Sequence, residues 1–239
     1  MAKKIVVEFD ENCLNEQRGL LIELDGVDAS GKASNVELLQ DTLTRMGYEV
    51  IVYHFPEYNT VTGELIAKYL RGEYGNLTLE QKELISVLYA SDRAKQIQDI
   101  NAYLDNGAIV LMDRYTYSNV YSIAEYPKEL WDEKMEWTEN LEFNCMQVPK
   151  PDYVFFLHVD PEISIQRCKE RGIEDYQNGK EDIHESNFEL MKTVSECYNY
   201  FCDKKDNWIK IDEMEGNKQL PLDKVFAKLL LEVTNVLTK

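Results

Sequence analysis

Gly26-Val27-Asp28-Ala29-Ser30-Gly31-Lys32 is the stretch that decides the fold, because it follows an apolar run at 19–25 and leads into a segment with helical spacing. Two glycines five residues apart let the backbone turn tightly, so that several N–H groups converge on one anion at the positive end of the next helix. An ordinary strand-to-helix turn is the alternative. The spacing and context favour a phosphate-binding loop in which Lys32 reaches the β- and γ-phosphates.

The loop pattern ends irregularly. The hydroxyl residue expected directly after the lysine is missing, since Ala33 stands there and Ser34 follows one place later. The loop residues that we expect to contact a nucleotide are Gly26, Val27, Asp28, Ala29, Ser30, Gly31, Lys32, Ala33 and Ser34. The sequence leaves three alternatives for Asp28: binding Mg²⁺ through water, accepting a hydrogen bond from a substrate hydroxyl, or shaping the loop as an Asx turn.

Length and charge restrict the function classes. A chain of 239 residues with 44% hydrophobic residues buries one substantial core, which favours a single large domain. The net charge of −18 argues against a protein that wraps DNA or RNA, because such binding depends on a basic face. Small anionic ligands need only a local cluster of N–H, Arg and Lys groups. We therefore expect nucleotides as partners rather than nucleic acid.

Cysteine usage and hydropathy indicate a cytoplasmic protein. The five cysteines are scattered without a CxxC pair, so neither a disulfide framework nor a zinc site is expected. The first residues contain too short an apolar run for a signal peptide, and nothing approaches the roughly 18 apolar residues of a membrane span.

Short apolar runs alternate with segments of helical period, which predicts a parallel sheet covered by helices on both faces. The expected strands are Leu20–Asp25, Glu49–His54, Ala108–Asp113, Tyr153–Val159 and Trp208–Ile211. The expected helices are Lys32–Met46, Leu79–Asn106, Pro161–Arg171, Ile183–Lys204 and Leu220–Leu237. The buried stripe of the first helix contains Val36, Leu39, Leu43 and Met46, and that of the second contains Leu84, Val87, Leu88, Ile97, Ile100 and Leu104.

Two segments lie outside this alternation. Residues 1–18 form an extension that is either an extra strand or loose chain, and 19–239 form the main domain. A polar stretch without apolar period, at about 172–183, separates two predicted helices and is typical of a mobile flap or lid.

Two further groups of residues suit a nucleotide. Asp113-Arg114-Tyr115 follows the third strand, so Arg114 faces the crevice of the loop and can hold a phosphate with two hydrogen bonds, although a capping Asp and a solvent-facing Arg are common there. Tyr89, Arg93 and Gln96 share one face if their helix is continuous, and a ring beside two hydrogen-bonding groups suits a nucleobase. Phe55 either lies beside the same base or belongs to the core.

These motifs, in this order, resemble thymidylate kinases, which are P-loop nucleoside monophosphate kinases. The resemblance runs from about Gly19 to the C-terminus. Besides the loop, it depends on Phe55-Pro56-Glu57-Tyr58, Leu88-Tyr89-Ala90-Ser91-Asp92-Arg93, Asp113-Arg114-Tyr115, Ser118-Asn119 and Pro149-Lys150-Pro151-Asp152. It implies a three-layer P-loop NTPase fold with a five-stranded parallel sheet, the reaction of ATP with dTMP to give ADP and dTDP with Mg²⁺, and a homodimer.

The resemblance also implies individual roles. Tyr89 stacks on thymine, Arg93 addresses its edge, and Ser118 and Asn119 add base contacts. Lys32 and the loop amides hold ATP, Arg114 holds the substrate phosphate, and Asp28 and Asp113 are the expected metal ligands.

The chain differs from the family pattern in its cations. Ala29 occupies the position of a loop arginine, so we expect the cation that stabilises the transition state to come from the lid side, from Arg167, Arg171 or Lys180. Glu57 and Tyr58 stand where an arginine near the monophosphate is usual. Two alternatives to a dTMP kinase therefore stay open: a kinase for another pyrimidine monophosphate, such as dUMP or a modified base, and an inactive nucleotide-binding homologue.

Overall fold

The computed structural model describes residues 18–180, 182–216 and 218–238. Its centre is a sheet of five parallel strands in the order β2-β3-β1-β4-β5. The strands are β1 (Leu21–Asp25), β2 (Val50–His54), β3 (Ile109–Asp113), β4 (Tyr153–His158) and β5 (Trp208–Asp212). All five predicted strands are confirmed within one residue at each end.

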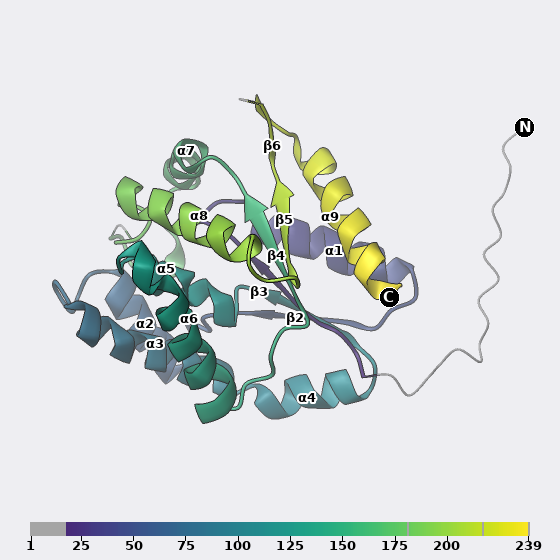
Figure 1. Cartoon of the computed structure of the whole chain (residues 1–239), viewed down its shortest axis with the longest axis horizontal. Coiled ribbons are helices and arrows are strands. Elements are labelled where there is room, and N and C mark those ends of the chain that lie inside the picture. The colour runs from purple at the N-terminus through teal and green to yellow at the C-terminus, as the bar shows by residue number, and fades with distance from the viewer. Residues whose placement is uncertain (1–17, 181, 217, 239) are drawn as a thin grey trace, which may run out of the picture.

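Helices cover both faces of the sheet, as predicted (Figure 1). The α-helices are α1 (Lys32–Arg45), α2 (Val61–Leu70), α3 (Leu79–Ala94), α4 (Ile97–Asp105), α5 (Val120–Ile123), α6 (Trp131–Glu139), α7 (Pro161–Arg171), α8 (Phe188–Cys202) and α9 (Leu222–Leu237). Short 3₁₀ turns are η2 (Thr116–Asn119), η3 (Lys128–Leu130) and η5 (Asp175–Gln177), and η4 (Asn140–Cys145) is a π-helical turn. A small antiparallel ribbon joins β6 (Met214–Glu215) to β7 (Lys218–Gln219).

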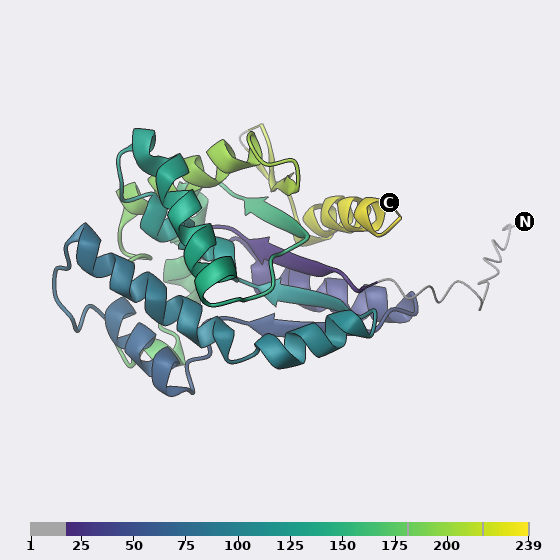
Figure 2. The ribbon, with the colours of Figure 1, turned by 60° about the horizontal axis from the view of Figure 1, so that its bottom comes forward.

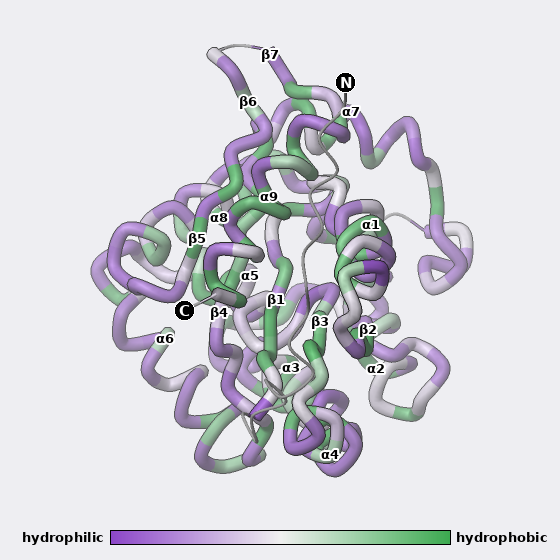
Figure 3. Tube along the Cα trace, turned by 90° about the vertical axis from the view of Figure 1, so that its right-hand side faces the viewer, coloured by the Kyte–Doolittle hydropathy of each residue, from purple (hydrophilic) through white to green (hydrophobic). Residues whose placement is uncertain are grey.

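Side chains of alternate residues on each strand enter different cores. On β1, Ile22 and Leu24 pack with α1 and α9, while Leu21 packs with α4 on the opposite face. A third cluster buries α5, α6 and α8 against β4 and β5. Figure 3 shows these central strands as hydrophobic segments within a largely hydrophilic periphery.

The prediction of one long helix at 79–106 is wrong. The chain forms α3 and α4, with a break at Lys95 and Gln96 where Gln96 has φ −99° and ψ 3°. Tertiary contacts explain the break: the buried Asp92 carboxylate accepts hydrogen bonds from Lys95, Thr60 and Thr62, and the turn brings α4 onto the sheet. The stripe shifts as well, because Leu84 is 66% exposed and Ile85 is buried instead.

Other boundaries also moved. Met46 is the C-cap of α1 and is 38% exposed rather than buried. Residues 183–186 form turns, so α8 begins at Phe188 with the Asn187 side chain as its cap. The sequence patterns did not reveal α2, α5 or α6. The predicted extension at 1–18 lies outside the described residues except for Arg18, which pairs with Asp152 at 3.2 Å.

Helices α2 and α3 form a pair at the end of the sheet toward which the strands run (Figure 2). They pack against residues of the predicted lid, because Ile183 donates its N–H to Leu70 O and Tyr176 joins their apolar cluster. No helix within the described ranges is both long and apolar enough to cross a membrane.

Candidate functional site

The loop between β1 and α1 folds around the ammonium group of Lys32. Gly26 has φ +151°, and a Cβ there would lie 2.6 Å from Leu157 O, so only glycine fits this close approach. Lys32 Nζ donates to Gly26 O at 3.1 Å, Val27 O at 2.8 Å and Ser30 Oγ at 3.3 Å. All three acceptors are neutral oxygens. Burial, together with Arg114, lowers the pKa of Lys32 to about 8, although Asp28, Asp25 and Asp113 oppose this shift.

Helix α1 presents its amino end to the same loop. Gly31 is its N-cap at φ +77°, with no side-chain hydrogen bond to the first turn, and the first intrahelical bond runs from Asn35 N to Gly31 O. The N–H groups of the first turn therefore point outward without intrahelical partners, where they attract an anion. This is the geometry expected of a phosphate-binding loop.

Arg114 lies beside this loop because β1 and β3 are neighbours, with Leu24 paired to Asp113. Its backbone is left-handed at φ +64°, a conformation that costs a non-glycine residue about 1–3 kcal/mol and aims the side chain across the strand ends. The guanidinium forms an ion pair with Asp28 and lies 3.4 Å from Gly26 O. The predicted meeting of Arg114 with the loop in one crevice is confirmed.

Tyr121, on α5, is part of the site that the sequence did not single out. Its hydroxyl accepts the N–H of Asp28 at 2.9 Å and donates to Asp28 Oδ2 at 2.8 Å. Its ring lies 5.7 Å from the Arg114 guanidinium carbon, within cation–π range. Burial alone raises the pKa of Asp28, but Arg114, Lys32 and this hydroxyl outweigh it and lower that pKa.

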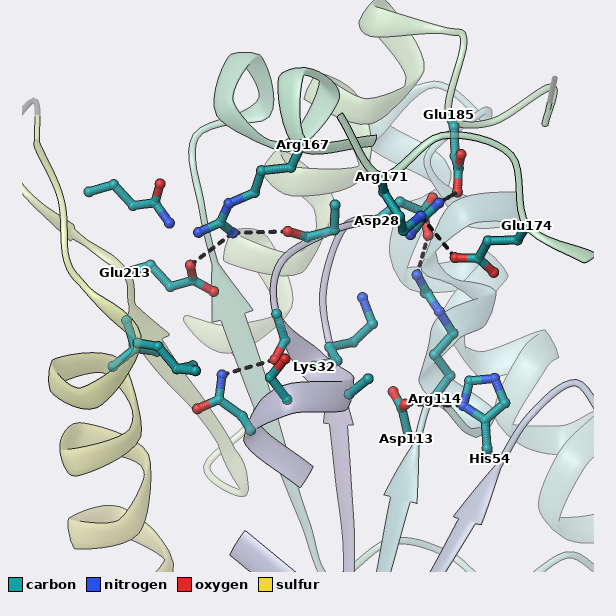
Figure 4. A pocket seen from close by; sticks show the side chains of 18 of the residues that line it. Asp28, Lys32, His54, Asp113, Arg114, Arg167, Arg171, Glu174, Glu185 and Glu213 are labelled. Carbon is teal, nitrogen blue, oxygen red and sulfur yellow. Dashed lines mark hydrogen bonds and ion pairs between the residues drawn. The ribbon is translucent and has the colours of Figure 1, made fainter. Parts of the chain in front are cut away.

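The loop opens into a cavity of about 790 Å³. Figure 4 shows Lys32, Arg114, Arg167 and Arg171 converging on this space from different elements. Arg167 donates to Ala29 O at 2.9 Å and pairs with Glu213 at 3.4 Å. We call this cavity the phosphate crevice.

The two lid-side arginines that the sequence suggested both line the phosphate crevice, whereas Lys180 does not. Arg171 is held by Glu174 at 2.9 Å and by Glu185. Lys180 pairs with Glu73 at 3.0 Å. Burial raises the pKa of both Glu185 and Glu213 to about 7, although each faces an arginine.

Asp113, at the end of β3, lines the phosphate crevice and lies 3.0 Å from His54 Nδ1 through Oδ2. Burial alone raises its pKa, but the hydrogen bond and charge of His54, with Lys32 and Arg114, outweigh burial and lower it. Asp113 is therefore a carboxylate at neutral pH.

A second, smaller cavity of about 80 Å³ adjoins the phosphate crevice, and Asp28, Tyr58, Arg114 and Tyr176 line both. The remaining residues that line it are Tyr69, Leu70, Tyr89, Arg93, Ser118, Asn119, Tyr121, Ser122, Asp182 and His184. We call it the base pocket.

The structure brings four of the predicted base contacts together in the base pocket: Tyr89, Arg93, Ser118 and Asn119. Gln96 is not among them, because the break after α3 turns it away, and its Nε2 lies 3.4 Å from Glu57. Phe55 is also absent from this pocket. It is 3% exposed, packs against Tyr115, and lines the phosphate crevice instead.

Buried carboxylates fix the residues of the base pocket. Arg93 Nη1 lies 2.5 Å from Glu142 Oε1, with side chains 2% and 0% exposed. Asn119 Nδ2 reaches the same oxygen at 2.8 Å. Ser118 Oγ donates to Asp25 at 2.6 Å. Sequence reasoning did not select Glu142, because nothing in its local spacing distinguishes it from the other acidic residues.

The predicted lid lies against α2 and the loop that follows β2. The rings of Tyr58 and Tyr176 stack at 4.2 Å with an angle of 7° between their planes. Arg71 donates to Tyr176 O at 2.7 Å. His184 Nε2 lies 3.1 Å from the Tyr69 hydroxyl, and its ring stacks on Tyr121 at 5.2 Å. These contacts place the lid segment as a wall of both cavities.

Comparison with known proteins gives one consistent result. The family described as thymidylate kinase matches residues 24–221. The chain is 30% identical over 181 residues to a thymidylate kinase of Mycobacterium tuberculosis, covering 75% of this chain and 84% of the relative. It is 29% identical over 222 residues to that of Plasmodium falciparum, covering 93% of each. The solved thymidylate kinase of Candida albicans superposes with a TM-score of 0.69 at 24% identity, covering 91% of this chain and 92% of that one.

Proposed function

Because the chain belongs to the thymidylate kinase family, whose members are phosphotransferases, we propose that it transfers the terminal phosphoryl group of ATP to dTMP, giving ADP and dTDP. The observation that carries this proposal is the junction of two cavities at Arg114. One cavity contains the loop and Lys32, and the other contains Tyr89 and Arg93.

The phosphate crevice suits the donor nucleotide. The outward N–H groups of α1 and the Lys32 ammonium bind phosphate oxygens, and Lys32 exchanges its neutral carbonyl partners for charged ones. Leu222 and Val225 of α9 line the same cavity and give an apolar surface for a base. The volume of about 790 Å³ is in the range typical of nucleotide-sized ligands.

The residues fit a metal ion that arrives with the nucleotide. Within the described ranges, no group of three or more His, Cys, Asp and Glu side chains is arranged to hold a metal. Mg²⁺ is commonly bound by one or two carboxylates together with waters and substrate phosphates. Asp113 supplies such a carboxylate beside Lys32, while Asp28 is already paired with Arg114 and Tyr121. The ion supplies charge neutralisation between phosphates when bound.

The base pocket suits the acceptor. Tyr89 offers an aromatic face, and Arg93 and Asn119 offer polar atoms for the edge of a pyrimidine. Arg114 lies where the two cavities meet, which is where the acceptor phosphate must face the donor. Of the other predicted contacts, Phe55 lines the phosphate crevice rather than the base pocket, and Gln96 lines neither cavity.

The proposed mechanism requires positioning and charge stabilisation rather than a covalent intermediate. Lys32 and Arg114 hold donor and acceptor phosphates on the two sides of the transferred group. Arg167 and Arg171 are the lid-side cations that can approach that group, since both line the phosphate crevice. Residues 172–183 act as the lid that excludes water, and a homodimer remains the expected assembly.

An assay of ADP release tests this function and its alternatives. We expect turnover with ATP, Mg²⁺ and dTMP, and a lower kcat/KM with dUMP, dCMP, dGMP and UMP. Preference for dUMP or another pyrimidine would favour the first alternative. Saturable binding of ATP and dTMP without ADP release would favour an inactive homologue. Arg114→Ala is the site variant, and Arg45→Ala, which removes an exposed arginine paired with Asp41, is the matched control.

A further inference from the structure

Glu142 is a buried carboxylate behind the base pocket. It lies in the π-helical turn η4, is 0% exposed, and its main-chain oxygen accepts the N–H of Val148 at 3.0 Å. Its Oε1 serves two residues of the pocket at once, Arg93 and Asn119. These two residues come from separate elements, α3 and η2, so one carboxylate oxygen links both sides of the pocket.

The amide of Asn119 has a single possible orientation. Its Nδ2 donates to Thr116 O at 2.9 Å and to Glu142 Oε1 at 2.8 Å. A main-chain carbonyl and a carboxylate oxygen accept but do not donate, so a rotated amide would place its oxygen against two oxygens. Both amide hydrogens are therefore used. In the part of the chain that the structure describes, no side chain or amide donates to Asn119 Oδ1, which leaves this oxygen to accept from a ligand.

Arg93 provides the opposite polarity. A guanidinium only donates, and the ion pair with Glu142 fixes its plane near the Tyr89 ring, whose centroid lies 5.8 Å from the guanidinium carbon. Among the polar groups that line the pocket, Asn119 Oδ1 is therefore a fixed acceptor and Arg93 a fixed donor group.

This pattern matches one class of pyrimidine. Thymine and uracil present a donor at N3–H and an acceptor at O4, whereas cytosine presents an acceptor at N3 and a donor at its 4-amino group. In thymine or uracil, N3–H can donate to Asn119 Oδ1 and O4 can accept from Arg93. In cytosine, the acceptor N3 would face the acceptor Asn119 Oδ1, and the donor 4-amino group would face the donors of Arg93. Leaving such buried groups unpaired is costly.

We propose that Glu142 is the positioning residue that makes the base pocket select 4-oxo over 4-amino pyrimidine monophosphates, by fixing the Asn119 amide and the Arg93 guanidinium through one shared oxygen. The inference rests on the proposed function, since it concerns the acceptor of that reaction. It requires a hydrogen-bond acceptor at Oε1. Because Glu142 Oε2 has no partner within the described residues, a glutamine can place its amide nitrogen there and keep Oε1 unchanged.

Two substitutions separate this role from general support of the fold. Glu142→Met removes the acceptor, and we expect the ratio of kcat/KM for dTMP to that for dCMP to fall about 10- to 100-fold, mainly through KM for dTMP. Glu142→Gln keeps the acceptor, and the ratio should stay within about threefold of wild type. Glu139→Met is the matched control, because Glu139 also accepts hydrogen bonds in this segment but from Tyr117 and Lys205, outside the pocket.

A folded Glu142→Met protein with the wild-type ratio would overturn the proposal, and so would a Glu142→Gln protein that loses as much selectivity as Glu142→Met. Wild-type enzyme gives an independent check that needs no variant. N3-methyl-dTMP, which lacks the donor, should lose at least about tenfold in kcat/KM, whereas dUMP, which keeps N3–H and O4, should lose less. Equal use of N3-methyl-dTMP and dTMP would overturn it. Absence of wild-type turnover with dTMP would instead refute the proposed function.

Discussion

Lys32 in the phosphate crevice and Arg93 in the base pocket are held in different ways. Lys32 is surrounded by two carbonyl oxygens and a hydroxyl, all neutral and all within the loop that precedes it. Arg93 is paired with a carboxylate from a segment 49 residues away, and neither side chain has appreciable contact with solvent. Lys32 is thus held by hydrogen bonds to neutral oxygens, whereas the charge of Arg93 is neutralised by Glu142.

The difference follows from what each region must bind. A triphosphate brings its own negative charge, so an ammonium held by neutral oxygens gains when the anion arrives. A pyrimidine base is neutral, and an unpaired guanidinium buried beside it would carry a large desolvation cost. We therefore expect substitutions at Lys32 to affect activity more than stability, and substitutions at Arg93 to affect both.

The largest effect is expected from Lys32→Met. Loss of the ammonium should lower kcat by about 10²- to 10³-fold, because it removes a fixed charge from the transferred phosphate. The free energy of unfolding should fall by about 1–3 kcal/mol, less than for a variant of Arg93, since two carbonyls and a hydroxyl lose a donor but no charge is left unpaired. Steady-state kinetics and urea unfolding measure the two quantities. Near-normal turnover of Lys32→Met would contradict the proposal that this loop binds the transferred phosphate.

Arg93→Met should destabilise the protein by about 3–5 kcal/mol, because Glu142 would keep the Asn119 amide but remain as a buried charge without its countercharge. The double variant Arg93→Met with Glu142→Met should recover most of that loss while KM for dTMP stays high. Denaturant unfolding of the two singles and the double gives the coupling energy. Additive losses in the double variant would show that the pair is not an energetic unit.

A smaller effect is expected from pH. Lys32 has a pKa lowered to about 8 and is charged below that value, so phosphate should bind most tightly there. As pH rises above about 8 the free protein loses this proton, and the affinity for ATP should fall by up to about tenfold per pH unit. Calorimetric titration between pH 6.5 and 9.5 measures the decline. Lys32→Met should lack the decline, and a pH-independent affinity in wild type would contradict the assignment.

The smallest effect is expected from Gln96→Ala. Gln96 lines neither cavity, and among the described residues its side chain reaches only Glu57, so KM for ATP and for dTMP should both stay within about twofold of wild type. A rise in KM for dTMP but not for ATP would instead indicate that Gln96 contacts the base, as the sequence predicted.

The sequence predicted the phosphate crevice better than the base pocket for a physical reason. The loop is one contiguous stretch whose turn, helix start and lysine depend on local backbone geometry, and strand ends bring Arg114 to it. The base pocket is lined by residues of α2, α3, η2, α5 and the predicted lid, and η4 supports it from behind. The residues next to Glu142 and Tyr121 in the sequence form no motif that indicates their roles. Gln96 was assigned to the same helix face as Tyr89 and Arg93 because helical spacing does not show where tertiary contacts end a helix.

Four residues, Asp28, Tyr58, Arg114 and Tyr176, form walls of both cavities, and the stacked rings of Tyr58 and Tyr176 span from the loop after β2 to the lid. A ligand in one cavity that moves these four residues therefore changes the walls of the other cavity. Thermodynamic reciprocity then requires that if dTMP alters the affinity for ATP, ATP alters the affinity for dTMP by the same factor. Any coupling between the affinities for the two nucleotides is thus linked to the position of two tyrosine rings.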